Sequence, residues 1–149
     1  MTIIVGLVRD NEVYMGCDGA GTGHNYTQSK IVEPKVFSNG ETLMGMCGSF
    51  RLGQILQYVL KIPDRDPRNE CDMSWLVNDY VDAVRNTLKN KGHIHEKDGE
   101  FNIPNGDYLL GYKGSLYVVE DNFQILKIDE EYLTTGCGLP LEINVIQFI

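Results

Sequence analysis

Thr2 is the residue whose chemistry depends most on its place in the chain, because it directly follows Met1. A threonine hydroxyl is a weak nucleophile and needs a base to take its proton. Removal of Met1 would free the α-amine of Thr2, whose unperturbed pKa of about 7.7–8.0 leaves part of it neutral near physiological pH. Threonine is small enough for an aminopeptidase to trim the methionine before it. A single residue would then supply both a nucleophile and its base.

Two other stretches contain residue types that bind ligands. His93 and His95 would share one face of a strand beside Glu96, but this stretch is polar and has no further ligand nearby. A solvated loop is therefore favoured over a metal site. The glycine-rich residues 19–23 lack the lysine and the following helix pattern of a phosphate-binding loop. We expect neither a metal nor a cofactor.

Composition limits the classes of function. The chain has 149 residues, a mass of 16.8 kDa and a formal net charge of −8, so we expect one acidic domain over residues 1–149 that does not bind nucleic acid or anionic membranes. No apolar run is long enough to span a membrane, and the N-terminus lacks a signal peptide, so a cytoplasmic location is expected. The four cysteines contain no C-x-x-C pair, which favours buried, reduced thiols over a zinc site.

The elements that must position Thr2 begin with two hairpins. Residues 3–8 and 13–17 are β-favouring runs that predict two strands largely buried on both faces. Residues 19–34 are rich in glycine and polar residues and predict a long loop. Residues 35–37 and 42–47 flank Asn39-Gly40, whose tolerance of positive φ predicts a hairpin turn.

Two helices and a run of strands follow. Ser49 can cap a helix from Phe50 that ends by Pro63, and Asp72 can cap a second helix that stops at Gly92. Residues 93–107 read as a loop. Strands are expected over residues 108–112, 116–119, 123–128 and 132–135. This order predicts an α+β fold of stacked antiparallel sheets with helices packed outside.

Five segments, taken in order, resemble the proteasome β-subunits and their bacterial peptidase relatives, which are N-terminal-nucleophile hydrolases. They are Thr2 at the head of a strand, Gly16-Cys17-Asp18-Gly19, Pro34-Lys35-Val36-Phe37, Met46-Cys47-Gly48-Ser49 and Thr135-Gly136-Cys137-Gly138. The resemblance implies a four-layer α-β-β-α sandwich. It also implies a threonine-type peptidase in a homo-oligomeric ring that takes peptide or protein substrates, and leaves open an ATP-dependent unfoldase partner.

The resemblance assigns a role to each matching residue. Lys35 would sit beside Thr2, lower the pKa of its amine and favour a developing alkoxide. Asp18 would hold Lys35 in a buried, hydrogen-bonded pair, and the Gly48 N–H would point at the oxyanion. Cys137 replaces the family's serine near the amine. Taken singly, these residues read as a turn aspartate, a strand-edge lysine, a turn before a helix cap and a buried thiol.

The chain also departs from the family pattern after residue 138. Only eleven residues follow, 139–149, without counterparts of the aspartate and serine that organise the family's nucleophile. We therefore keep open a catalytically inactive proteasome-like structural subunit or a truncated homologue. A small-molecule amidase of the same superfamily is a third alternative.

Overall fold

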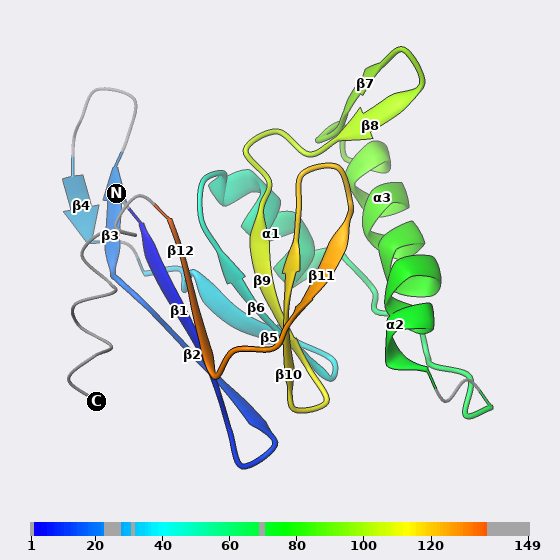
Figure 1. Cartoon of the computed structure of the whole chain (residues 1–149). Helices are drawn as coiled ribbons and strands as arrows, with labels where there is room; N and C mark the ends of the chain where they lie inside the picture. Colours follow the sequence, from blue (N-terminus) through cyan, green and yellow to red (C-terminus); the bar gives the residue numbers. More distant parts are fainter. Residues whose placement is uncertain (1, 23–27, 31, 69–70, 137–149) are drawn as a thin grey trace.

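The computed structural model describes residues 2–22, 28–30, 32–68 and 71–136, which form two stacked antiparallel sheets with helices on one side (Figure 1). The three-stranded sheet has the order β12 (Tyr132–Gly136), β1 (Ile3–Arg9), β2 (Glu12–Cys17). The five-stranded sheet has the order β11 (Ile125–Ile128), β10 (Ser115–Val119), β9 (Tyr108–Tyr112), β6 (Thr42–Met46), β5 (Val36–Asn39). The predicted α+β class of antiparallel sheets with outer helices is confirmed.

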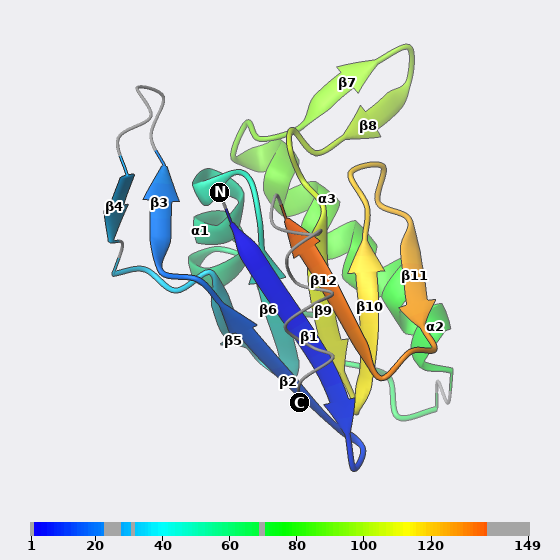
Figure 2. The same ribbon diagram turned by 60° about the vertical axis from the view of Figure 1, so that its left-hand side comes forward.

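Glycines let the two sheets approach closely. Figure 2 views the stacked sheets with β1 and β12 in front of the five-stranded sheet. A Cβ placed on Gly45 of β6 would lie 2.6 Å from Cγ2 of Ile4 in β1. A Cβ on Gly111 of β9 would lie 2.8 Å from Cγ1 of Val13 in β2. Side chains larger than hydrogen would push the sheets apart. These two glycines therefore set the spacing between the three-stranded and the five-stranded sheet.

The helical layer covers the other face of the five-stranded sheet. Its elements are α1 (Phe50–Tyr58), α2 (Asp72–Trp75), the π-helical turn η1 (Leu76–Tyr80) and α3 (Val81–Asn90). Buried side chains of these helices form one core cluster with the residues of β5, β6, β9, β10 and β11 that face them. The Tyr80 and Tyr108 hydroxyls share a buried hydrogen bond of 2.9 Å that ties η1 to β9. Within the described residues, the helices are too short or too polar to cross a bilayer.

The caps and turns match the sequence predictions in part. Ser49 caps α1, with its hydroxyl accepting from the Leu52 N–H, as predicted. Asp72 is the first residue of α2 rather than its cap, which is Cys71, and the Asp72 carboxylate pairs with Arg65. The hairpin between β5 and β6 is confirmed, but Gly40, with φ of +57°, begins the two-residue turn.

Three other predictions were wrong. The expected loop 19–34 contains a small hairpin of β3 (Ala20–Thr22) and β4 (Gln28–Lys30), and the expected loop 93–107 contains β7 (His95–Lys97) and β8 (Glu100–Asn102). Strands β1 and β2 are not buried on both faces. Only alternate residues face the five-stranded sheet, and Tyr14 on the outer face is 52% exposed.

Candidate active site

Asp18, directly after β2, fixes the start of β1 next to Thr2. One of its carboxylate oxygens accepts from the Ile3 N–H at 2.7 Å, and the other accepts from the Ala20 N–H at 2.9 Å. Its own N–H donates to the Ile3 carbonyl at 3.2 Å. Because β1 and β2 form a tight hairpin, their far ends lie side by side, which brings these residues together from distant positions. The backbone that carries Thr2 is therefore held by one side chain.

Lys35, just before β5, is bound to the same carboxylate. Its Nζ lies 2.9 Å from each Asp18 oxygen and 2.5 Å from the Ala20 carbonyl oxygen. The side chain of Lys35 is only 3% exposed, and that of Asp18 is 26% exposed. An ammonium group has three protons to donate, so these three contacts use all of them. The buried positive charge is thus compensated and fixed in position.

The pKa of Asp18 reflects this environment. Burial by itself raises it, because a charged carboxylate loses hydration. The hydrogen bonds from the Ile3 N–H, the Lys35 ammonium and the Ala20 N–H act the other way and outweigh burial, so the pKa of Asp18 lies below its usual value. Asp18 is therefore a carboxylate at neutral pH, and the pair with Lys35 is ionic.

Gly48 lies in the sharp turn between β6 and α1. Its φ is +95°, a backbone conformation that other residues rarely adopt. A Cβ at this position would also lie 2.7 Å from the Asn105 carbonyl oxygen. Only glycine fits here, and Ser49, which caps α1, follows immediately. The turn therefore presents backbone at the position where the sequence predicted an oxyanion donor.

The end of β12 reaches the same place from the other side of β1. Gly136 pairs with Ile3, and a Cβ on Gly136 would collide with the Thr2 carbonyl oxygen. The adjacent Thr135 hydroxyl lies 3.6 Å from the Cys47 sulfur. Cys137, the predicted partner of the amine, lies outside the described residues. The segment that leads to it nevertheless contacts the backbone of Thr2 directly.

A pocket of about 140 Å³ opens at this junction. Of the five predicted site residues, Thr2, Lys35 and Gly48 line it, and Asp18 is joined to it through Lys35. The rest of the wall consists of Glu33, Pro34, Met46, Cys47, Ser49, Phe50, Gly53, Gln54 and Gln57. Sequence reasoning missed Gln54 and Gln57, which are three residues apart and so share one face of α1. In the sequence, the only sign of these two residues is that each is a polar residue next to an apolar one in the amphipathic pattern of α1.

The two other stretches that contain potential ligand residues, 93–96 and 19–23, do not form a site within the described residues. His95 and Glu96 lie in β7 and are exposed. His93 has a buried Nε2, and its pKa is lowered by burial first and by the charges of Arg51 and His95 second. Within the described ranges, His, Cys, Asp and Glu side chains form no group of three that could hold a metal ion. Part of the glycine-rich segment 19–23 forms β3 instead of a phosphate-binding loop.

Comparison with known structures identifies similar folds. BPH from Thiobacillus denitrificans in complex with epoxomicin matches with a TM-score of 0.69 and 12% identity, covering 98% of this chain and 78% of that one. Anbu, an ancestral β-subunit from Yersinia bercovieri, matches at 0.57 and 12% identity, covering 99% and 66%. HslV from Trypanosoma brucei matches at 0.52 and 10% identity, covering 91% and 72%. No protein-family model and no curated protein matches the chain.

These neighbours are proteasome-like N-terminal-nucleophile hydrolases. The likeness extends over almost the whole chain at low sequence identity, so it concerns the fold. It confirms the resemblance that the order of Thr2, Asp18, Lys35 and Gly48 predicted. The described residues account for three of the four expected layers: the helices and the two sheets.

Proposed function

We propose that this protein is a threonine-type peptidase or amide hydrolase in which Thr2, freed by removal of Met1, is the nucleophile. The observation that carries the proposal is the pocket where Thr2, Lys35 and Gly48 meet, with Lys35 held by Asp18. These segments lie far apart in the sequence, and each is fixed by a specific hydrogen bond or glycine turn. The fold shared with BPH, Anbu and HslV supports the same reaction class.

The chemistry follows from the donors and acceptors at this junction. The Thr2 hydroxyl oxygen attacks a substrate carbonyl carbon while its proton passes to the neutral α-amine of the same residue. The oxyanion of the tetrahedral intermediate accepts from the Gly48 N–H. The protonated α-amine then donates its proton to the leaving nitrogen, which leaves an ester on Thr2. Water, deprotonated by the amine, hydrolyses that ester and releases the acid product.

Lys35 contributes through its charge. Its three protons are used by Asp18 and Ala20, so it does not donate to the Thr2 hydroxyl in this arrangement. A buried ammonium beside the pocket still favours the neutral form of the Thr2 amine and the negative charge that develops on oxygen. Asp18 holds that charge in place without itself contacting substrate, so it is a positioning residue.

Two measurements test the proposal. The intact mass of the protein from cells should lack Met1, and fluorogenic peptides should be hydrolysed. Thr2→Ala should reduce turnover to background, whereas Thr2→Ser, which keeps a hydroxyl and an amine, should retain it. Hydrolysis that is unchanged in Thr2→Ala, or a cellular protein that keeps Met1 throughout, would contradict the proposed nucleophile.

A non-catalytic subunit of the same fold is the second candidate. The observation in its favour is that the Lys35 ammonium is fully engaged by Asp18 and Ala20, which leaves no proton for Thr2. In that case Asp18 and Lys35 only connect β2 to β5. The candidate predicts a folded protein that hydrolyses no peptide or amide, and Thr2-dependent turnover would exclude it.

Assembly and the fourth layer are part of the same proposal. On the outer face of the three-stranded sheet, Leu7 lies between Tyr14 and Tyr132, which are 52% and 38% exposed. An apolar face of this kind requires a cover, so we propose the second helical layer of the sandwich there.

A helical assembly of the Anbu complex from Pseudomonas aeruginosa is among the neighbours, and we propose a homo-oligomer for this chain. Light scattering of the full chain tests it, and a monomer would favour the amidase alternative. A peptide or protein substrate, an unfoldase partner and a cytoplasmic location belong to the same proposal.

A further inference from the structure

A second and larger cavity lies at the opposite end of the five-stranded sheet from Thr2. Its volume is about 510 Å³. The turn between β5 and β6 and the turn between β9 and β10 form two of its walls, whereas the Thr2 pocket lies where β5 starts and β6 ends. Figure 1 shows the strands that these turns connect. The lining residues are Gly40, Glu41, Ile62, Pro63, Asp64, Arg65, Pro67, Trp75, Tyr112 and Lys113. The proposed hydrolase chemistry makes no use of this cavity.

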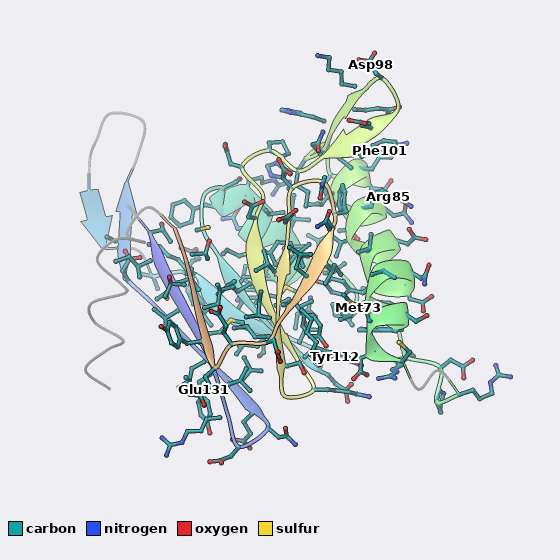
Figure 3. All side chains as sticks on the ribbon, viewed as in Figure 1. Met73, Arg85, Asp98, Phe101, Tyr112 and Glu131 are labelled. Carbon is teal, nitrogen blue, oxygen red and sulfur yellow. The ribbon has the colours of Figure 1, made fainter. Side chains whose placement is uncertain are left out.

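Two lining residues carry buried polar groups whose protons have no acceptor among the described residues. In the part of the chain that the structure describes, only Trp75 Nε1, His93 Nε2 and the Tyr112 hydroxyl are in this condition. Trp75 and Tyr112 are 1% and 2% exposed, and their rings stack at 4.9 Å between centroids. Arg65 lies beside the Tyr112 hydroxyl, but a guanidinium only donates, so the hydroxyl proton still lacks an acceptor. Figure 3 shows Tyr112 at the end of β9 on the side of Met73 and α2.

Unpaired buried donors are rare in folded proteins because each costs free energy. Two of them on neighbouring rings that line one cavity call for an acceptor supplied from outside. The described residues around the cavity do not supply it, and the carboxylate of Asp72 is already shared by Arg65 and Lys113. The donors therefore fit the oxygen of a ligand that enters the cavity.

The charges of the wall indicate what kind of ligand this is. Glu41 and Asp64 are balanced by Arg65 and Lys113, so the cavity has no excess of either sign. Both unpaired donors are themselves uncharged. The remaining surface is provided by two prolines, Ile62 and the stacked aromatic rings. These features favour a neutral molecule with a flat or apolar body over a free anion.

We propose that this cavity is a second binding site, specific for a compact, uncharged molecule whose carbonyl-type oxygen accepts from the Trp75 N–H and the Tyr112 hydroxyl. The Lys113 ammonium lies 5.5 Å from the centre of the Tyr112 ring, and its side chain is half exposed. Because the site is remote from Thr2, its occupancy is independent of the proposed hydrolase activity.

The single tryptophan of the chain makes the site directly observable. Benzamide, a neutral aromatic amide, is titrated into the full chain while the one indole N–H resonance is followed by NMR. We expect a saturable shift with a dissociation constant of about a millimolar, appropriate to so small a probe. Benzylamine, which is an ammonium ion at neutral pH and so has the same ring but no acceptor, should leave the resonance unchanged. Absence of a saturable shift with benzamide, or equal binding of benzylamine or preferential binding of benzoate, would overturn the proposal.

Tyr112→Phe removes only the hydroxyl, and Tyr58→Phe, at an exposed tyrosine outside the cavity, is its control. Benzamide should bind Tyr112→Phe about tenfold more weakly and Tyr58→Phe unchanged. Because the Arg65 guanidinium lies beside this hydroxyl, the urea midpoint of each variant is measured without ligand to show that the variant is folded. Unchanged benzamide affinity in folded Tyr112→Phe would separate the hydroxyl from the ligand and overturn the site.

Discussion

The Lys35 ammonium and the Asp18 carboxylate form a bidentate ion pair, with Nζ 2.9 Å from each oxygen. The pair joins the end of β2 to the start of β5, and Asp18 also holds the Ile3 N–H beside Thr2. The lysine is almost completely buried, so its charge depends on this partner. One carboxylate thus holds both the backbone next to Thr2 and the buried ammonium of Lys35.

Asp18→Asn is expected to destabilise the protein strongly. The substitution leaves Lys35 buried without a counter-charge, which costs about 3 kcal/mol of the free energy of unfolding. Asp82→Asn, which breaks the exposed ion pair with Arg85 on α3, is the matched control and should cost no more than about 0.5 kcal/mol. Urea unfolding at neutral pH measures both. Equal losses in the two variants would mean that the Asp18 pair contributes no more than a surface contact.

The stability contributed by Asp18 should depend on pH. Its pKa in the folded protein lies below the ordinary value of 3.8, so below that value the unfolded chain binds the proton first. This contribution is therefore fully present above the ordinary pKa and is lost as the pH falls through the folded one. Urea unfolding from pH 5 to pH 2, a range of about three units around these pKa values, should show a steeper loss in the wild type than in Asp18→Asn. Parallel curves would contradict the assignment.

Local patterns in the sequence predicted much of this fold. The strand at Tyr108–Tyr112 has the predicted limits because a continuous apolar run marks a strand buried on both faces. Ser49 caps α1 because a short hydroxyl side chain before an apolar periodicity satisfies the free N–H groups of the first turn. Both signals involve only neighbouring residues, so they can be read without tertiary structure.

The predictions were wrong where the sequence has no such local pattern. Asp98 and Gly99 both have positive φ and form the turn between β7 and β8, but the flanking residues are exposed and show no apolar alternation. The order of Thr2, Asp18, Lys35 and Gly48 indicated the candidate site through its family resemblance. The wall formed by Gln54 and Gln57 could not be predicted, because it depends on how α1 lies against the end of β6.

Tyr80 and Tyr108 should show strong energetic coupling. Their hydroxyls are fully buried and bonded to each other, so Tyr80→Phe leaves the Tyr108 hydroxyl without a partner and should cost about 1–2 kcal/mol. Tyr108→Phe should cost a similar amount. The double variant removes both hydroxyls and should cost clearly less than the two single variants together. A double-mutant cycle by urea unfolding gives the coupling energy, and additive losses would contradict a direct bond.

Gly48→Ala should impair both stability and the proposed reaction. The alanine would have to adopt the φ of +95° that Gly48 has, and its methyl group would press against the Asn105 carbonyl oxygen. The turn must therefore move. We expect a loss of about 2–3 kcal/mol in unfolding free energy, together with loss of peptide hydrolysis as the Gly48 N–H leaves its position.

Gly92→Ala is the control that separates backbone strain from steric contact. Gly92 has a φ of +65°, and a Cβ added to it would meet no atom within 4 Å, so the alanine should cost only about 1 kcal/mol and leave hydrolysis unchanged. Thermal unfolding and peptide turnover of both variants test the comparison. Gly48→Ala with normal turnover would mean that the oxyanion donor lies elsewhere, even if the stability loss is as expected.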